Sequence, residues 1–343
     1  MPSSSALPTT AKAPLRLWQR LLAGVLALLV LLVAGFFLGP RYDAGASTPA
    51  QREPPPQDIA ALDDWLAAGE ARQADIKPGN AKGIIWNGAA KQRTPWSIVY
   101  LHGFSASRGE TAPLTDEVAR ALGANVFYTR LSGHGRSSAA AMGEASLQDW
   151  MADTLEAVRI GQTLGERVLL ISCSTGSTLA SWLATTPEGV RVAADVFISP
   201  NYGPKDKRAE IINGPWGMEI AQALQGEYTG ASASNAREAQ ITTPRYPTRA
   251  LHPMMAIVER ARAADLSKFQ TPVLVLYSEN DQTVDPQETL TAFKRIGAPL
   301  KAIESVGYSK SKGQHVLAGE TRDPQAVAPM AASIVKWVQA LPR

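Results

Sequence analysis

The residue with the clearest chemical potential is Ser174, which lies between an apolar run and a helical pattern. Residues 167–177 read RVLLISCSTGS, with Gly176 two positions after this serine and Ser172 two positions before it. At a sharp turn from a strand into a helix, small residues at these positions let the two elements pass closely, and the serine hydroxyl projects above the sheet. The pattern therefore predicts a nucleophilic serine in a turn of the G-x-S-x-G type. A simple helix N-cap made of small polar residues is the alternative interpretation.

Two backbone N–H groups, those of Phe104 and Thr175, are candidates for an oxyanion hole. Such a site needs two fixed donors directed at the negative charge that develops on an attacked carbonyl oxygen. Thr175 directly follows the serine, and Phe104 follows a His-Gly pair after the apolar run 97–101. An ordinary turn can have the same His-Gly sequence, so this prediction depends on the motifs around it.

An acid and a base follow Ser174 in the order that a catalytic triad needs. Asp281 comes just after a late apolar run, where a loop side chain can orient a histidine. Asp285 precedes a proline and is better interpreted as the N-cap of the next helix. His315 is the only histidine after Asp281. The order Ser174, Asp281, His315 predicts a nucleophile, an orienting acid and a general base.

The other reactive side chains predict neither a metal site nor a nucleotide site. The chain has one cysteine, Cys173, and four histidines, and no two histidines have the spacing of a helical metal-binding pair. The Gly-rich loop 131–137 matches neither phosphate-binding consensus, and His134 within it is interpreted as structural. We therefore expect no metal and no organic cofactor.

The elements that must position these groups alternate between apolar strands and amphipathic helices. This alternation indicates an α/β fold with a mostly parallel sheet covered on both faces, and two short strands before the first long helix suggest an antiparallel start. Ser146 and Asp149 are placed for a variant of the capping box. The expected strands cover 83–87, 97–101, 125–129, 167–171, 193–198, 272–277 and 300–304, and the expected helices cover 58–74, 111–122, 146–164, 175–186, 286–296 and 324–340.

Residues 201–270 interrupt this alternation and predict a cap inserted into the sheet domain. The segment is long, contains several Gly and Pro residues and lies between two expected strands. Its apolar side chains would suit an acyl or alkyl group, and the candidate substrate-lining residues are Trp216, His252, Met254 and Met255. An ordinary surface excursion is the alternative for the segment, and packing within the cap is the alternative for His252.

An apolar run of 18 residues, 21–38, contains no charged or polar side chain. As a helix the run would span roughly 27 Å, close to the thickness of a bilayer core. We interpret residues 21–39 as an uncleaved transmembrane signal anchor, through which the chain would be attached to a membrane in a single pass. A signal peptide cleaved after Ala46 is the alternative.

Basic residues before the apolar run predict the orientation of this anchor. Lys12, Arg16 and Arg20 precede the run, and no acid does, so we expect residues 1–20 to be a short cytoplasmic segment. The rest would then lie on the outer, periplasmic or extracellular side. It comprises a Pro-rich spacer over residues 40–57 and a catalytic domain over residues 58–343.

The composition agrees with one large globular domain beside the anchor. The chain has 343 residues, of which 45% are hydrophobic and 19% charged, and its formal net charge is +3. The basic excess lies within residues 1–42, so the remainder has no basic stripe of the kind that nucleic-acid binders carry. We therefore expect no nucleic-acid partner, and the sequence carries no signal for the oligomeric state.

Taken together, the motifs resemble the α/β-hydrolase superfamily, and within it the monoacylglycerol-lipase and serine-aminopeptidase-like branch. The resemblance covers about residues 83–340 and implies the same nucleophile, acid, base and oxyanion donors as above. Two residues depart from the family pattern, because Ser172 and Ser278 stand where relatives often have glycine. The motifs that carry the resemblance are LHGFSAS (101–107), SGHGRSS (132–138), SCSTGS (172–177), YSENDQTVDP (277–286) and GQHVLAG (313–319).

The predicted function is hydrolysis of a carboxylic ester, lipid-like or other, through an acyl-enzyme on Ser174. A membrane-tethered serine peptidase or amidase of the same fold is one alternative, in which Glu210, Glu219 and Glu227 of the cap would hold a substrate amine. A catalytically silent binding module is another alternative, although all three triad residues are present. The serine argues against the dehalogenase and epoxide-hydrolase chemistry of similar proteins, which use an aspartate at this position.

Overall fold

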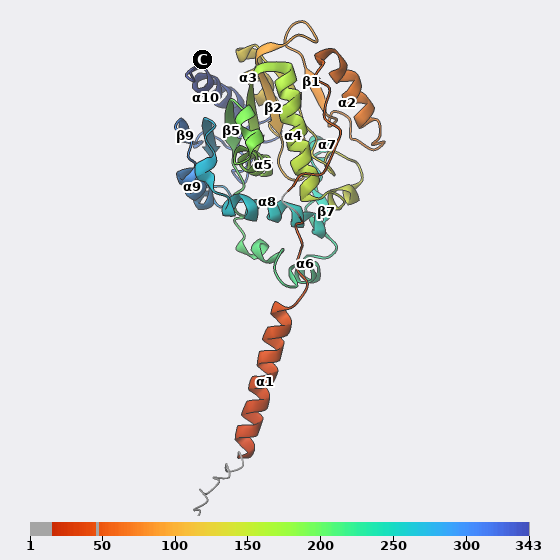
Figure 1. The fold of residues 1–343 in the computed structure, drawn as a ribbon, viewed down its shortest axis with the longest axis vertical. Coiled ribbons are helices and arrows are strands. Elements are labelled where there is room, and N and C mark those ends of the chain that lie inside the picture. The colour runs from red at the N-terminus through yellow and green to blue at the C-terminus, as the bar shows by residue number, and fades with distance from the viewer. Residues whose placement is uncertain (1–15, 46–47, 343) are drawn as a thin grey trace, which may run out of the picture.

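A long apolar helix, α1 (Leu17–Phe37), extends from a layered α/β domain in the computed structural model (Figure 1). The structure describes residues 16–45 and 48–342, so Lys12 and Ala46, which the predictions above invoke, lie outside the described residues. Among the described residues, α1 is the one helix whose length and mean hydropathy of 2.5 would suit a membrane span. A signal sequence near an N-terminus has the same properties.

The domain is built on a seven-stranded sheet in the order β1-β3-β2-β4-β5-β8-β9. Strand β1 pairs antiparallel with β3, which confirms the expected antiparallel start, and the other neighbours are parallel. The carboxyl ends of six strands therefore meet at one edge of the sheet. The strands are β1 (Gly83–Ile85), β2 (Thr94–Leu101), β3 (Asn125–Tyr128), β4 (Gly165–Cys173), β5 (Ala194–Ile198), β8 (Val273–Tyr277) and β9 (Lys301–Ser305).

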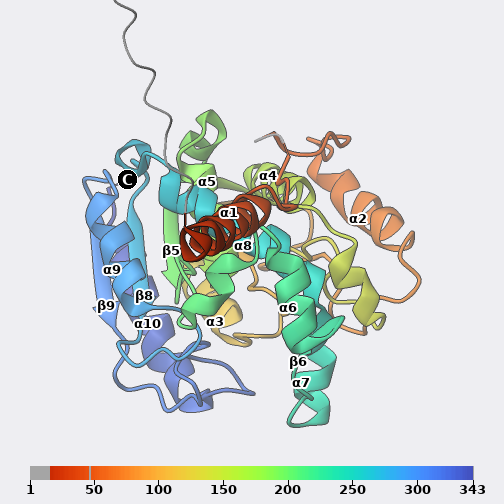
Figure 2. The same cartoon turned by 90° about the horizontal axis from the view of Figure 1, so that it is seen from below.

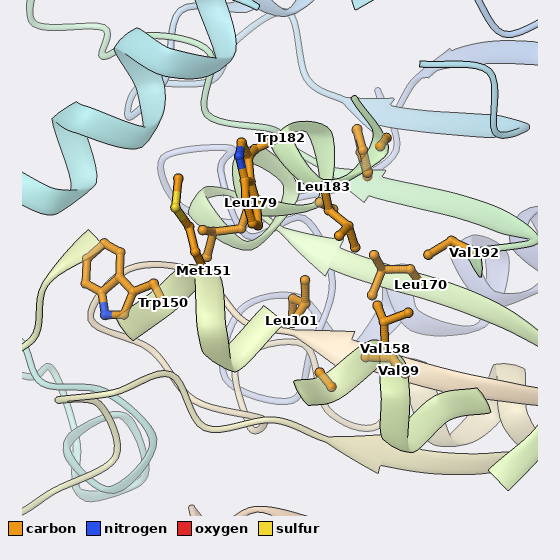
Figure 3. Close-up of a cluster of buried hydrophobic side chains, with 14 of the residues drawn as sticks. Val99, Leu101, Trp150, Met151, Val158, Leu170, Leu179, Trp182, Leu183 and Val192 are labelled. Carbon is orange, nitrogen blue, oxygen red and sulfur yellow. The ribbon is translucent and has the colours of Figure 1, made fainter. Parts of the chain in front are cut away.

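Helices cover both faces of the sheet, as the continuous apolar strands predicted. On one face, α2 (Leu62–Glu70), α4 (Leu147–Leu164), α5 (Thr175–Ala184) and α9 (Pro286–Arg295) contribute to the larger core cluster. On the other face lie α3 (Leu114–Leu122) and α10 (Val327–Gln339). Successive strand residues alternate between the faces, so Leu170 packs in the first cluster and Leu169 in the second. Figure 3 shows Leu170 beside Val99, with Leu183 of α5 above the sheet.

Helix α4 begins where the sequence predicted. The Ser146 hydroxyl accepts the Asp149 N–H, and the Asp149 carboxylate accepts the Ser146 N–H in return. This reciprocal pair satisfies two N–H groups that would otherwise lack partners at the helix start. Short 3₁₀ turns occur elsewhere at η1 (Ile59–Ala61), η2 (Ala139–Gly143), η3 (Pro187–Arg191), η4 (Lys207–Ile211), η5 (Thr248–Ala250), η6 (Leu266–Lys268) and η7 (Pro324–Ala326).

The cap is inserted between β5 and β8 and lies between the sheet and α1 (Figures 1 and 2). It contains a small apolar cluster of its own, formed by Ile212, Ala221, Met255 and Val258. Its longest helix also packs on α5, which joins the cap to the main core. The cap elements are α6 (Gly217–Gln225), β6 (Tyr228–Gly230), α7 (Ala236–Ile241), β7 (Arg245–Pro247) and α8 (Leu251–Ala263).

The segment between α1 and the domain runs along α4. The Gln148 side chain donates to the Ala44 carbonyl, and the Gln148 carbonyl accepts the Ala50 N–H at 3.0 Å. Arg52 then forms ion pairs with Asp149 and Asp153 of the same helix. The described residues of the segment expected to be a spacer are therefore held against the fold by backbone and side-chain contacts.

Candidate active site

Ser174 lies at the turn between β4 and α5. Its backbone φ of 51° is in the left-handed region, which is strained for a residue with a side chain and common at functional turns. A Cβ atom at Gly176 would lie 2.2 Å from the Leu101 carbonyl oxygen, so only glycine lets α5 start this close to the end of β2. The local structure therefore has the strand–turn–helix geometry that the sequence predicted.

Ser172, which departs from the usual glycine, fits because its hydroxyl has partners. The Ser172 Oγ atom lies 3.0 Å from the Ser177 Oγ atom and 3.3 Å from the Val196 carbonyl oxygen. A buried hydroxyl group costs little once it is hydrogen-bonded. The departure is therefore accommodated beneath the turn without displacing Ser174.

The side chains of Ser174, His315 and Asp281 form one continuous hydrogen-bonded chain. The His315 Nε2 atom lies 2.9 Å from the Ser174 Oγ atom, and the His315 Nδ1 atom lies 2.8 Å from Asp281 Oδ2. In a neutral imidazole with its proton on Nδ1, the ring donates to Asp281 and accepts from the serine hydroxyl. This arrangement is able to take a proton from the serine.

The loop after β8 holds Asp281 in place. The Asp281 Oδ1 atom accepts the backbone N–H groups of Thr283 at 2.7 Å and Val284 at 2.9 Å, which leaves Oδ2 for the histidine. The Asp285 side chain accepts the Gln287 N–H at the start of α9, so the prediction that Asp285 is an N-cap is confirmed. These contacts give the two neighbouring acids different structural roles.

Ser278, the second departure from the family pattern, links the acid loop to the histidine loop. Its hydroxyl donates to the Gln314 side chain at 3.0 Å and accepts the Asn280 N–H at 3.2 Å. Gln314 directly precedes His315. The hydroxyl therefore connects the segments that position the Asp281 carboxylate and the imidazole, a contact that glycine cannot make.

The loop after β2 is fixed in a way that sets the direction of the Phe104 N–H. The Leu131 N–H donates to His102 Nε2 at 3.0 Å, so the His102 proton lies on Nδ1, which donates to the Gly103 carbonyl at 2.8 Å. Burial lowers the pKa of His102 to about 4, which keeps the ring neutral. The C=O and N–H of a trans peptide unit point in opposite directions, so holding the Gly103 carbonyl also orients the Phe104 N–H.

Glu110 is a buried acid beside this loop, and no motif in the sequence points to it. Its Oε1 atom accepts the Gly103 N–H at 2.6 Å and the Tyr100 hydroxyl at 2.9 Å. Burial raises the pKa of Glu110 to about 7. A Cβ atom at Gly103 would lie 3.1 Å from Glu110 Oε2 and 3.2 Å from the Ser174 Cβ atom, so Gly103 is tightly packed between these two side chains. The position of Glu110, seven residues after Gly103, is not a recognisable sequence signal.

Two of the predicted substrate-lining residues, Met254 and Met255, are neighbours on α8 with different surroundings. Met254 is linked to the serine turn through Asn201, because its Sδ atom is 3.4 Å from Asn201 Nδ2 and the Asn201 N–H donates to the Ser174 carbonyl at 3.3 Å. Met255 is buried in the small apolar cluster of the cap. The lining role of these residues stays a prediction.

His252 and Trp216 contact the segment that follows α1. The His252 ring stacks on Tyr42 with centroids 4.1 Å apart, and its Nδ1 atom lies 2.8 Å from Asn213 Oδ1. The Trp216 backbone N–H donates to the Pro40 carbonyl at 2.8 Å. These contacts, together with that of the Trp216 indole with the Gly35 carbonyl oxygen at 3.4 Å, join the cap to the end of α1 and to the chain that follows it.

His134 packs against Phe104 and is not part of the hydrogen-bonded chain from Ser174 to Asp281. Its ring meets Phe104 edge to face at 5.9 Å and Trp150 at 5.4 Å, and its Nδ1 atom lies 3.1 Å from the Ser132 carbonyl oxygen. Burial lowers the pKa of His134 to about 3. Within the described ranges, no group of three His, Cys, Asp or Glu side chains is placed to hold a metal ion.

Residues 92–320 match the protein family described as serine aminopeptidase, S33. This match spans β2 and the loop after it, the serine turn, the cap, and the loops that carry Asp281 and His315. No curated protein matches the chain significantly.

Solved structures of lipolytic enzymes are similar to the chain in fold. One belongs to the metagenome-derived lipolytic enzymes LipS and LipT, with 21% identity, a TM-score of 0.62 and coverage of 77% of this chain and 99% of that one. A soluble variant of monoglyceride lipase from Saccharomyces cerevisiae has 13% identity, a TM-score of 0.58 and coverage of 87% and 98%. Monoacylglycerol lipase from Paleococcus ferrophilus has 18% identity, a TM-score of 0.55 and coverage of 75% and 97%. At these identities the likeness concerns the fold, which is that of α/β hydrolases.

Proposed function

The chain belongs to the serine aminopeptidase (S33) family of α/β hydrolases, and on this premise we propose that it cleaves carboxylic esters through a serine nucleophile. The observation that carries the proposal is the continuous chain of hydrogen bonds from Ser174 through His315 to Asp281. A serine hydroxyl is a weak nucleophile until an adjacent base can take its proton. The geometry of the three residues meets that requirement.

In the proposed reaction, Ser174 Oγ attacks the ester carbonyl carbon while His315 Nε2 takes the hydroxyl proton. The Asp281 carboxylate stabilises the imidazolium that forms. The N–H groups of Phe104 and Thr175 bind the oxyanion, and one such donor is typically worth about 3–4 kcal/mol in the transition state. The imidazolium then protonates the leaving alcohol. A water molecule, deprotonated by the same histidine, releases the acid from the serine.

An ester substrate is favoured over a peptide by the state of the cap acids. An aminopeptidase needs carboxylates near the nucleophile to bind the protonated substrate amine. Glu210 instead forms ion pairs with Arg262 at 3.1 Å and Lys207 at 3.5 Å. Glu219 and Glu227 are exposed. The lipolytic enzymes of similar fold also support an ester with an apolar acyl or alkyl group.

We further propose that α1 is a membrane anchor and that the domain over residues 58–343 lies on the outer side. The apolar composition of α1 and the basic residues Arg16 and Arg20 support this placement. A C-terminal fusion to a reporter that works only after export tests the orientation. Activity of the reporter is expected, and its absence combined with activity of a cytoplasmic reporter would refute the placement.

A fluorophosphonate probe tests the proposed nucleophile, because it reacts covalently with activated serines. The full chain in detergent is expected to be labelled, and Ser174→Ala is expected to lose the label. Ser267→Ala is the matched control, because this serine is exposed, its hydroxyl contacts Asp265, and it should not affect labelling. A folded parent protein that takes no label would contradict the proposal and favour a silent binding module.

Substrate class is then tested with p-nitrophenyl acyl esters against aminoacyl p-nitroanilides that carry a free amine. We expect hydrolysis of the esters at a rate that depends on Ser174. A protein that labels normally but prefers the anilides would be the tethered peptidase of the alternative hypothesis.

A further inference from the structure

The cap exposes a group of large apolar side chains on the segment nearest to α1. These side chains, here called the cap apolar face, are Ile211, Trp216, Leu224 and Tyr228. Beyond α1 and Leu38, the other large apolar residues exposed in the described structure are scattered singly at Ile85, Val190, Leu300 and Tyr308. Single exposed apolar residues are normal, whereas a group in one segment marks an interaction surface.

Trp216 places this face beside the end of the apolar helix. Its indole Nε1–H lies 3.4 Å from the Gly35 carbonyl oxygen, in the last turn of α1, and its backbone N–H donates to the Pro40 carbonyl. A Cβ atom at Gly39 would overlap the indole ring, at 1.9 Å from Nε1. The indole therefore lies at the level where the apolar run 21–38 ends.

The depth of Trp216 along α1 carries a physical meaning if α1 spans a bilayer. The end of an apolar run of this length coincides with the boundary between hydrocarbon and head groups. Tryptophan is enriched at this boundary, because its ring is apolar and its N–H is polar. A cap residue at that level brings the neighbouring cap surface to the membrane as well.

Contacts beyond α1 restrict how the domain is oriented relative to the helix. Tyr42 stacks on His252 of α8 with an interplanar angle of 8°. Two residues later the chain is bound to α4 through Ala44 and Gln148. Anchoring at two separate helices within a few residues makes the connection short and directed rather than a free linker.

Leu224 extends the face away from Trp216. Ile220 and Leu224 follow Trp216 at spacings of four and eight residues, which places them on one side of α6. Leu224 is 78% exposed, so nothing in the described structure covers it. An uncovered apolar stripe that starts at the end of a membrane helix is continuous with the surface that lipid covers.

We propose that the cap apolar face rests in the interfacial layer of the bilayer that α1 spans. The inference rests on the proposed anchor, and it does not depend on the hydrolase reaction. The contacts of Trp216, Tyr42 and Ala44 hold the cap toward the membrane, and the apolar face then exchanges water for lipid. The cap is thus the membrane-facing side of the domain, and the amino edge of the sheet faces water.

Site-directed spin labelling of the full chain in phosphatidylcholine vesicles tests this orientation. The native Cys173 is fully buried, so a cysteine introduced as Leu224→Cys can be labelled selectively. Val190→Cys is the matched control, because this apolar residue is 84% exposed and lies in η3, at the amino edge of the sheet before β5. Unsubstituted protein treated with the label gives the background.

The nitroxide at position 224 is expected to collide mainly with oxygen, which concentrates in lipid, and the nitroxide at position 190 mainly with a water-soluble nickel chelate. The ratio of oxygen to nickel accessibility should be several-fold higher at position 224. Equal ratios at both positions would overturn the proposal. Flotation of the vesicles is measured first, and a chain that does not float with them would overturn both the anchor and this orientation. Ester hydrolysis in the same vesicles reports separately on the proposed function.

Discussion

The Glu110 carboxylate accepts the Gly103 backbone N–H at 2.6 Å, which ties a buried acid to the loop next to Ser174. The Gly103 carbonyl is held from the other side by His102. The backbone N–H and C=O of Gly103 are therefore both fixed. Because the Phe104 N–H belongs to the same peptide unit as the Gly103 C=O, its direction is fixed as well. A loop held this firmly can keep a hydrogen-bond donor in place without reorganisation during a reaction.

We expect Glu110→Ala to lower kcat about ten-fold with little change in KM, because the loop that carries the Phe104 N–H loses one of its supports; this corresponds to about 1.4 kcal/mol of transition-state stabilisation. Glu110→Gln retains an acceptor oxygen for the Gly103 N–H and should keep most of the activity. Steady-state kinetics on a p-nitrophenyl ester measure both values. An equal loss in the two variants would mean that the charge matters and the hydrogen bond does not.

The buried pair His102 and His134 should make the protein sensitive to acid. Burial holds the pKa of His102 at about 4 and that of His134 at about 3, against 6.5 in the unfolded chain. Between these values the two histidines bind more protons in the unfolded state than in the folded state, so their contribution to stability falls as the pH falls below 6.5. Glu110, whose pKa is raised, contributes in the opposite direction. Each histidine contributes about 1.4 kcal/mol per pH unit. Urea unfolding at several pH values measures this slope.

His134→Phe isolates one of the two contributions. The phenyl ring keeps the aromatic contacts with Phe104 and Trp150. It loses the Nδ1 contact with the Ser132 carbonyl, whereas the Nε2 atom has no hydrogen-bond partner in the described structure. Between pH 6.5 and 4 the slope of stability against pH should therefore decrease by the contribution of one proton, which is about 1.4 kcal/mol per pH unit. An unchanged slope would show that His134 is protonated in the folded protein.

Gly176→Ala should disrupt the serine turn. The added methyl group would lie 2.2 Å from the Leu101 carbonyl oxygen, which is backbone and cannot rotate away. We expect a loss of about 1–3 kcal/mol in stability and a large loss of probe labelling, because the turn must shift. Gly307→Ala is the control, since a Cβ atom there meets nothing within 4 Å. Normal labelling of Gly176→Ala would contradict the close-packing argument.

The sequence was enough to bring together the candidate site residues that follow the ends of strands. Ser174 follows β4 directly and Asp281 follows β8, and parallel strands bring such positions to one edge of the sheet. Their order in the chain and the topology are therefore enough to bring them near each other. His315 is different, because it lies ten residues beyond the end of β9. Elimination of other histidines, not local structure, identified it.

What the sequence did not reveal depends on contacts between distant segments. Glu110 has no periodic signal, and its role becomes visible only when the Gly103 N–H meets it. The proline-rich composition of the segment 40–57 predicts a spacer, yet Arg52 contacts Asp153, which lies 101 residues away. Composition reports the stiffness of a segment but not the partner on which it packs.

Arg52→Ala tests whether this segment stabilises the domain. Asp153 is buried, and although burial alone would raise its pKa, the charges of Lys82 and Arg52 lower it. Removing the guanidinium leaves a buried carboxylate with one cation fewer, so we expect a loss of about 1–3 kcal/mol in stability. Arg208→Ala removes a fully exposed ion pair with Asp206 and should leave the unfolding midpoint unchanged. Thermal unfolding of both variants in detergent gives the comparison. An Arg52→Ala midpoint equal to that of Arg208→Ala would mean that the segment lies against α4 without stabilising the fold.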